Sequence, residues 1–162
     1  MREEQETLRG ILERLLLLHN NMLPLLEEER VALVKNKPKD LVAVLRKKEV
    51  LVEAIKKEDH QRHTLVVSLS HALGIPSESI TLSFLAERWQ DLWFIRLKDT
   101  FSQVLDEIRK RQESNNVLIQ TCQEIINQCI NLLYSSPSDS SYDPQGNIIS
   151  TDPLRGHLDK KI

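Results

Sequence analysis

The first 36 residues alternate apolar and polar positions with the period of an amphipathic helix. Spacings of three, four or seven residues place the apolar side chains on one face: Leu8, Leu12, Leu15, Met22, Leu26 and Leu33. The pattern predicts a long helix over residues 3–36. Pro24 falls inside this helix, and because proline removes a backbone hydrogen bond and crowds the preceding turn, we expect a kink or a break there.

A second stripe runs through residues 38–73. Pro38 suits a first helical turn, and Gly74-Ile75-Pro76 provides a cap followed by a helix breaker. The stripe follows alternating steps of four and three: Leu41, Leu45, Lys48, Val52, Ile55, Asp59, Arg62, Val66, Leu69 and Leu73. This heptad register predicts shallow, coiled-coil-like packing against neighbouring helices.

Two further helices are expected, over residues 78–88 and 90–134. Ser77 or Ser79 would cap the short one, which carries Ile80, Phe84 and Leu85. The long one repeats the same alternation: Phe94, Leu97, Phe101, Val104, Ile108, Arg111, Asn115, Leu118, Cys122, Ile125, Cys129 and Leu132. Short connections make successive long helices antiparallel. The sequence therefore predicts an all-α fold, an elongated antiparallel bundle of three long helices with a short connecting helix over residues 1–136. A mobile C-terminal tail rich in Ser, Pro and Asp follows over residues 137–162.

Composition and charge narrow the classes of partner. The chain of 162 residues has 40% hydrophobic residues, only 4% aromatic ones, and a net charge of −2 with both signs interspersed. No basic face is expected for nucleic acid or a membrane surface. The acidic N-terminal start and the amide residues that interrupt residues 114–138 predict a cytoplasmic protein without direct membrane insertion. Cys122 and Cys129, about 10.5 Å apart in helical rise, are expected as reduced core residues.

Candidate chemistry is sparse. No catalytic residues, metal ligands or cofactor motif are predicted, since His60 and His63 lack the Glu-x-x-His pairs of bundle metal sites, and a solvated charged face is favoured for them. Polar residues also occupy stripe positions: Lys48, Asp59, Arg62, Arg111 and Asn115. These residues either form a buried network that sets the register of the helices, or extend their long side chains to water from a loosely packed helix interface. The second interpretation is favoured.

The end of the third long helix differs from the rest of the chain. Residues 114–138 contain a single charged residue, Glu124, and apolar or amide residues cover most of the helix circumference. Because two facing helices do not easily cover this surface, we expect part of it to contact a partner helix, with the short helix or self-association as alternatives. The candidate binding residues are Val117, Leu118, Ile119, Cys122, Ile125, Ile126, Cys129, Ile130 and Leu133.

A turn signal follows in the serine-rich tail. Asp143, Pro144 and Gly146 stand at the first, second and fourth positions of a favourable type I turn. This turn would present Tyr142 as a recognition aromatic.

Four segments resemble the FlgN family of flagellar type III export chaperones: "EEERVALVKNKPKDLVAVLRKKEVLVEAIKKEDHQRHTLVVSLSHALGI", "ERWQDL", "ESNNVLIQTC" and "YDPQG". The most distinctive matches are Glu29-Arg30 with Ala32-Leu33, Lys48-Glu49, Asn116 with Leu118-Ile119, and the Tyr142 turn. Pro24 and the sequence after Gly146 depart from the family pattern.

The resemblance implies a non-enzymatic chaperone for the C-terminal helical segments of hook-filament junction proteins, also called hook-associated proteins. Such a chaperone keeps its clients unpolymerised and delivers them to the cytoplasmic domain of the flagellar export gate. The family places client and gate contacts in the C-terminal region, which implies gate docking by Tyr142, Asp143, Pro144 and Gly146. The alternative is a structural or adaptor coiled-coil protein that acts by oligomerisation, and homodimer formation stays open. A metal-dependent bundle enzyme would need inward carboxylates that the stripes lack.

Overall fold

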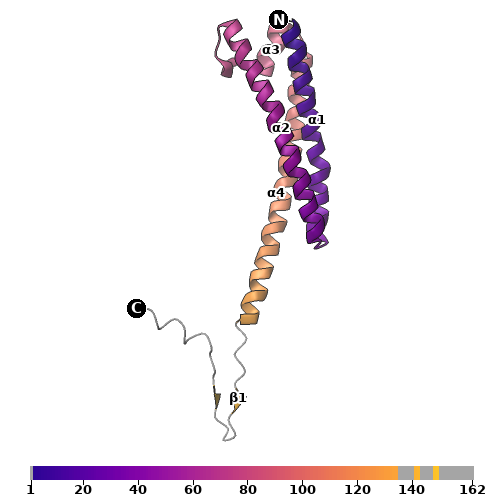
Figure 1. Ribbon diagram of the computed structural model, residues 1–162, viewed down its shortest axis with the longest axis vertical. Coiled ribbons are helices and arrows are strands. Elements are labelled where there is room, and N and C mark those ends of the chain that lie inside the picture. The colour runs from indigo at the N-terminus through magenta and orange to yellow at the C-terminus, as the bar shows by residue number, and fades with distance from the viewer. Residues whose placement is uncertain (1, 135–140, 143–147, 150–162) are drawn as a thin grey trace, which may run out of the picture. The chain divides into compact units, whose positions relative to one another are not determined.

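The computed structural model describes residues 2–134, 141–142 and 148–149 (Figure 1). Its helices are α1 (Arg2–Val34), α2 (Pro38–Leu73), the 3-10 turn η1 (Ser77–Ser79), α3 (Leu82–Trp89) and α4 (Trp93–Tyr134). Two short strands, β1 (Ser141–Tyr142) and β2 (Ile148–Ile149), pair in antiparallel register. The predicted all-α class, with three long helices and a short one, is confirmed. The chain divides into two compact units, residues 1–119 (unit 1) and 120–162 (unit 2).

Local backbone chemistry explains where α1 ends and where α2 begins and ends. After α1, Asn36 adopts a left-handed φ of 49°, which asparagine tolerates better than most residues, and Pro38 then opens α2. At the far end of α2, Gly74 adopts a φ of 67°, and the backbone N–H of Ile75 donates to the Ser70 carbonyl at 3.2 Å. Glycine closes the helix there because it has no Cβ to oppose this conformation.

The short helix begins later than expected. Ser77–Ser79 form the turn η1, and Thr81 caps α3 by accepting a hydrogen bond from the Phe84 N–H at 3.1 Å. The predicted cap at Ser77 or Ser79 is therefore wrong. Ser77, Ser79 and Thr81 can all cap a helix. Thr81 is the residue that caps α3, and the helix that starts there buries Leu85 and Ala86.

The predicted break at Pro24 is also absent. α1 continues through Pro24, whose side chain is exposed. The helix loses the single hydrogen bond that proline cannot donate, but its apolar stripe continues on both sides, with Met22 and Leu26 buried. Tertiary packing along this stripe holds the two halves of the helix together.

An apolar cluster of buried residues in unit 1 joins α1, α2, α3 and α4. It contains Leu8, Leu12, Leu69, Leu85, Ala86, Phe94 and Leu97. Because the starts of α1 and α4 meet the end of α2, α1 and α4 run parallel and α2 runs antiparallel to both (Figure 1). Trp93 packs edge-on against Phe94 at 4.9 Å between ring centroids, and the Arg9 guanidinium lies 4.6 Å from the Trp93 ring centroid while pairing with Asp91 at 2.7 Å. The predicted antiparallel order of successive long helices is therefore observed.

The buried register of α2 differs from the predicted stripe at positions 45, 52 and 59, whereas Val66 is buried as predicted. Positions 41, 48, 55, 62 and 69 face the other helices as expected, but Val44 is buried where Leu45 was expected, and Leu51 is more buried than Val52. Glu58, not Asp59, reaches α1, where it pairs with Arg14 at 3.0 Å. The stripe was misassigned because apolar residues occupy both flanks of α2, and only its packing against α1 distinguishes them.

Candidate functional site

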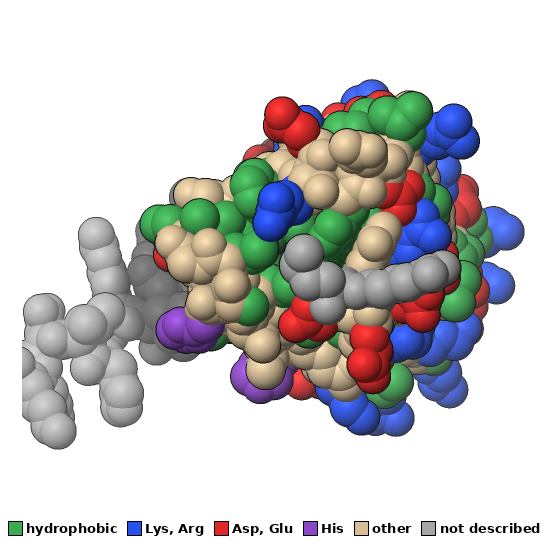
Figure 2. Space-filling view, turned by 90° about the horizontal axis from the view of Figure 1, so that it is seen from above, with side chains coloured by type: hydrophobic (Ala, Val, Ile, Leu, Met, Phe, Trp, Pro, Cys, Tyr) green, Lys and Arg blue, Asp and Glu red, His purple; other side chains and the backbone are tan. Residues whose placement is uncertain are grey.

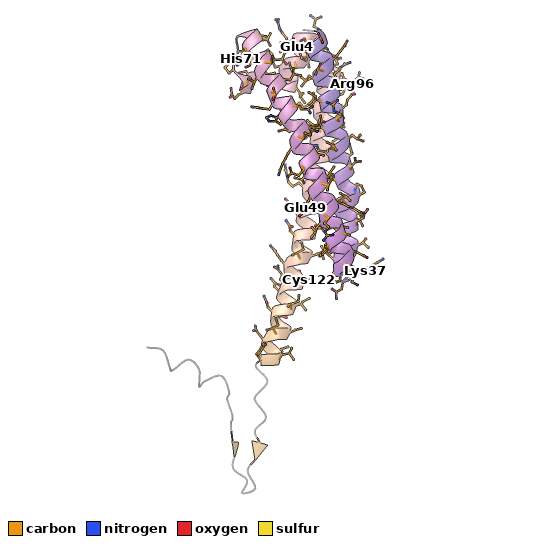
Figure 3. All side chains as sticks on the ribbon, in the orientation of Figure 1. Glu4, Lys37, Glu49, His71, Arg96 and Cys122 are labelled. Carbon is orange, nitrogen blue, oxygen red and sulfur yellow. The ribbon has the colours of Figure 1, made fainter. Side chains whose placement is uncertain are left out.

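Residues 122–133 of α4, which belong to unit 2, expose a continuous apolar surface. Cys122 projects from α4 in Figure 3, and the side chains of Ile125, Ile126, Ile130 and Leu133 are 54%, 57%, 43% and 77% exposed. Cys129 is exposed as well, so the expectation that the two cysteines lie in a core is wrong. Large apolar side chains that stay exposed in a group commonly mark a binding surface.

Helical geometry places these side chains on one side of α4. At about 100° per residue, the apolar residues between positions 122 and 133 fall within one sector, and the polar residues of this segment fall outside it. We call this sector the apolar arc: Cys122, Ile125, Ile126, Cys129, Ile130, Leu132 and Leu133. Leu132, which is 72% exposed, belongs to the arc although the candidate set omitted it. Its place in the four-three alternation was the signal that could have included it.

The remaining candidates lie in unit 1. Val117 is 60% exposed, and Leu118 and Ile119 are half-buried. The α4 stripe is buried or half-buried from Phe94 to Leu118, and it becomes exposed from Cys122 onward. The predicted binding residues therefore fall into two groups. Residues 117–119 are partly covered, and those from Cys122 to Leu133 are exposed.

The opposite side of this segment carries almost no charge. Gln123, Asn127, Gln128 and Asn131 are exposed amides, and Glu124 is the single charged residue of the segment. Amides bind water and partner groups without a long-range field, so this part of α4 has no electrostatic preference for a strongly charged partner. By contrast, acidic and basic side chains are interspersed on the face of the molecule shown in Figure 2.

A buried polar layer connects the three long helices within unit 1. Lys48 Nζ donates to the two Glu29 carboxylate oxygens at 3.0 and 2.9 Å and to Gln112 Oε1 at 3.2 Å. Asn115 Nδ2 donates to Glu29 Oε2 at 2.8 Å and to the Leu26 carbonyl at 2.9 Å. Glu29 and Asn115 are only 2% and 1% exposed. The layer aligns the helices, because Lys48 on α2 must meet Glu29 on α1 and Gln112 on α4 together.

This layer corrects the interpretation favoured from sequence. Lys48 and Asn115 belong to a buried network and do not simply reach water, whereas Asp59 and Arg62 form a surface pair at 2.7 Å, as that interpretation expected. Arg111 is half-buried and pairs with Glu107 at 2.7 Å. Sequence reasoning missed Glu29, although its spacing from Leu26 and Leu33 puts it on the α1 stripe.

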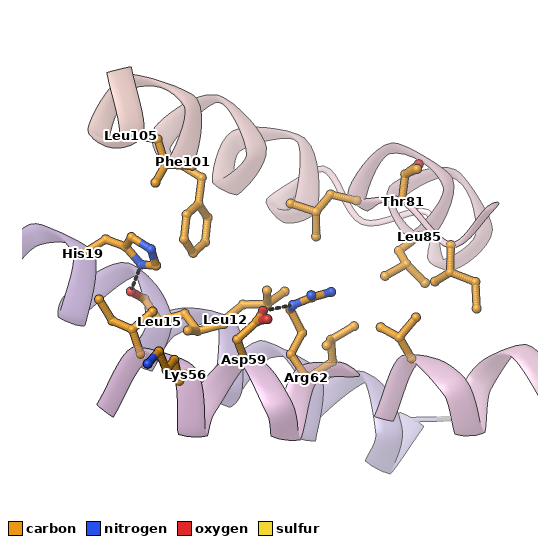
Figure 4. A pocket seen from close by; sticks show the side chains of 15 residues that line it. Leu12, Leu15, His19, Lys56, Asp59, Arg62, Thr81, Leu85, Phe101 and Leu105 are labelled. Atoms are coloured by element: carbon orange, nitrogen blue, oxygen red, sulfur yellow. Dashed lines mark hydrogen bonds and ion pairs between the residues drawn. The ribbon is translucent and has the colours of Figure 1, made fainter. Parts of the chain in front are cut away.

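Unit 1 also contains an apolar cavity of about 530 Å³ (Figure 4). Leu12 and Leu15 of α1, Leu85 of α3, and Phe101 and Leu105 of α4 line it. The pair formed by Asp59 and Arg62 also lies at the cavity, and His19 contacts the Phe101 ring edge-on at 5.9 Å. The candidate set included none of these residues.

The histidines considered as metal ligands are not gathered into a metal site in the described part of the chain. Among the described residues, no group of three or more His, Cys, Asp or Glu side chains is arranged to hold a metal ion, and His60 and His63 are exposed. In the same part of the chain, no helix combines the length and apolar character needed to cross a membrane.

The expected gate-docking residues lie mostly outside the described part of the chain. The Tyr142 backbone forms β1 and pairs with Ile148, but its side chain, together with Asp143, Pro144 and Gly146, is outside the described residues. The expected boundary at residues 136–137 also falls outside them, as does the tail apart from β1 and β2.

A helical fold with an extended apolar surface on one helix is typical of proteins that act by binding other proteins. Among known protein families, the FlgN protein family matches residues 1–148. Because this match covers nearly the whole chain, the chain belongs to the FlgN family of flagellar export chaperones, and the resemblance seen in the sequence is confirmed. This is a family of chaperones and not of enzymes. No curated protein and no solved structure gives a significant match.

Proposed function

We propose that this chain acts in the cytoplasm, without catalysis, as an export chaperone for hook-filament junction proteins. It binds their C-terminal helical segments, prevents their premature assembly, and delivers them to the cytoplasmic domain of the export gate. The exposed apolar arc of α4 carries the proposal, because family membership alone does not locate the client.

The arc has enough apolar surface for a reversible interaction. Its five large aliphatic side chains, Ile125, Ile126, Ile130, Leu132 and Leu133, are between 43% and 77% exposed. Fully burying one such side chain contributes about 1.5–3 kcal/mol, so covering the exposed parts contributes roughly 5–10 kcal/mol in total. Loss of motional freedom on association offsets much of this gain, so we expect the interaction to be reversible.

The chemistry of the arc favours a helical client. An amphipathic helix can place apolar side chains at intervals of three and four residues against the arc while its polar side stays in water. A segment held this way cannot at the same time use its apolar face to join a filament. Covering that face therefore explains how a chaperone of this kind prevents assembly.

Delivery is assigned to the turn after Tyr142. Tyr142 stands directly before this turn and has an aromatic ring with one hydroxyl. Tyrosine is one of the residues that often dominate the binding energy of an interface. The turn is separated in sequence from the apolar arc, so one chain can hold a client and contact the gate with different residues.

Client binding can be tested by placing a charge on the arc. Ile126→Asp is expected to weaken binding of a purified hook-filament junction protein at least about tenfold in calorimetry, because the new carboxylate must be desolvated in the contact. Asn127→Asp is the matched control, since it adds the same charge at the neighbouring exposed position outside the arc.

Far-UV circular dichroism should be unchanged in both variants, because both positions are exposed. Equal affinities for the folded Ile126→Asp variant and the wild type would place the client elsewhere. Absence of any client binding by the wild type would refute the proposed function.

A further inference from the structure

The apolar arc is wider than the contact of one partner helix. Ile125 and Leu132 lie at one edge, Ile126 and Ile130 lie toward the other, and Cys122, Cys129 and Leu133 lie between them. At about 100° per residue, the arc spans about 160° of the helix circumference. A two-helix coiled-coil seam uses only two positions in seven and is much narrower. The arc uses two further heptad positions, one occupied by Ile126 and Leu133 and the other by Ile130.

α1 provides a comparison within the same molecule. It packs against both α2 and α4, through the polar layer and through the apolar cluster of unit 1. At about 100° per residue, its buried residues span about 100° over residues 8–15, from Ile11 to Leu12, and about 120° over residues 22–32, from Leu26 to Ala32. The apolar arc of residues 122–133 is therefore at least as wide as the surface that α1 buries between two other helices.

The residues beside the arc indicate which chemistry a helix that binds it should have. Opposite charges beside a seam normally select the partner and orientation of a helix pair. Here the flanking residues are neutral, including Gln123 and Gln128, and Glu124 lies on the far side of the helix. The matching helices should therefore be amphipathic and should also have uncharged residues beside their apolar faces.

From these observations we propose that residues 122–133 of α4 lie between two helices of a single client, as α1 lies between α2 and α4. This inference rests on the proposed function and specifies its binding mode. A single helix would leave one edge of the arc in water, either Ile125 with Leu132 or Ile126 with Ile130. Two helices cover both edges and hold the segment from two sides.

Site-specific photo-crosslinking separates the two arrangements. A photoreactive phenylalanine analogue replaces Ile125 or Ile130 in the full-length chain, two exposed positions that lie about 140° apart on the helix. Asn127, on the polar side, is the control position. Each variant is mixed with a full-length hook-filament junction protein, irradiated, and mapped by mass spectrometry, after circular dichroism has shown unchanged helix content.

The expected result is that Ile125 and Ile130 crosslink to two different helices of the client and that Asn127 crosslinks to neither. Crosslinks from both edges to the same client helix would overturn the two-helix arrangement. So would crosslinks from either edge to a second copy of this chain or to its own residues 135–162.

Calorimetry on the wild-type chain keeps this test distinct from that of the proposed function. If no client binds, the proposed function fails and the two-helix arrangement fails with it. If the client binds but the crosslinks identify one helix, only the arrangement fails. Because charge contributes little to this contact, the dissociation constant should change less than about threefold between about 0.05 and 0.5 M salt. A larger weakening would contradict the neutral partner surface.

Discussion

Replacing Glu29 with alanine should destabilise unit 1 far more than the same replacement of its neighbour Glu28. The two glutamates form similar ion pairs with neighbouring lysines, at 2.9 Å from Glu29 to Lys48 and 2.7 Å from Glu28 to Lys47. Their surroundings differ, because the side chains of Glu29 and Lys48 are 3% and 15% exposed, while those of Glu28 and Lys47 are 48% and 57% exposed. The comparison therefore contrasts a buried ion pair within a hydrogen-bond network with an exposed ion pair.

The expected magnitude follows from what Glu29→Ala leaves behind. Lys48 keeps its charge in a largely buried position with Gln112 as its remaining hydrogen-bond partner among the described residues, and the Asn115 amide loses one of the two acceptors it has there. Removing one partner of a buried pair typically costs 3–5 kcal/mol, and because Lys48 is partly exposed we expect about 3 kcal/mol. Glu28→Ala removes a surface pair and should cost less than about 1 kcal/mol.

Urea and thermal denaturation followed by circular dichroism measure both effects. For a chain of this length, about 3 kcal/mol corresponds to a fall in Tm of roughly 6–12 °C. The double variant Glu29→Met with Lys48→Met should lie within about 1.5 kcal/mol of the wild type, because it removes both charges together. If Glu29→Ala were no more destabilising than Glu28→Ala, the buried layer would not hold the three helices in register.

Three further predictions concern the helix ends and the gate contact. Thr81→Ala removes the cap of α3 and should lower stability by about 1 kcal/mol, measured by urea denaturation; an unchanged midpoint would show that the cap contributes nothing. Gly74→Ala should cost about 1–2 kcal/mol in the same assay, since a Cβ there meets no atom within 4 Å and the left-handed φ alone opposes it; a stabilised variant would refute this reasoning. Tyr142→Ala should leave the melting temperature and client affinity unchanged and weaken binding to the cytoplasmic domain of the export gate in a pull-down. Lost client binding with intact gate binding would overturn the delivery role.

The sequence alone predicted the elements and their order, because these depend on local chemistry. Apolar periodicity located the three long helices, and Pro38 with Gly74 marked the two ends of α2. The low charge of residues 114–138 indicated the unusual surface of α4 before its exposure was known. In each case the residues that decide the outcome are close together in the chain.

Only the tertiary structure decided which side of each stripe becomes buried. Val44 and Leu45 are both apolar, and packing against α1 buries the first. Lys48 and Asn115 were correctly placed on stripes, but their burial depends on Glu29, which comes from a third helix. The pattern that buries Phe94 and Leu97 continues to Cys129, yet Cys129 is exposed. Periodicity defines the apolar side of a helix, whereas burial also requires another part of the chain to cover that side.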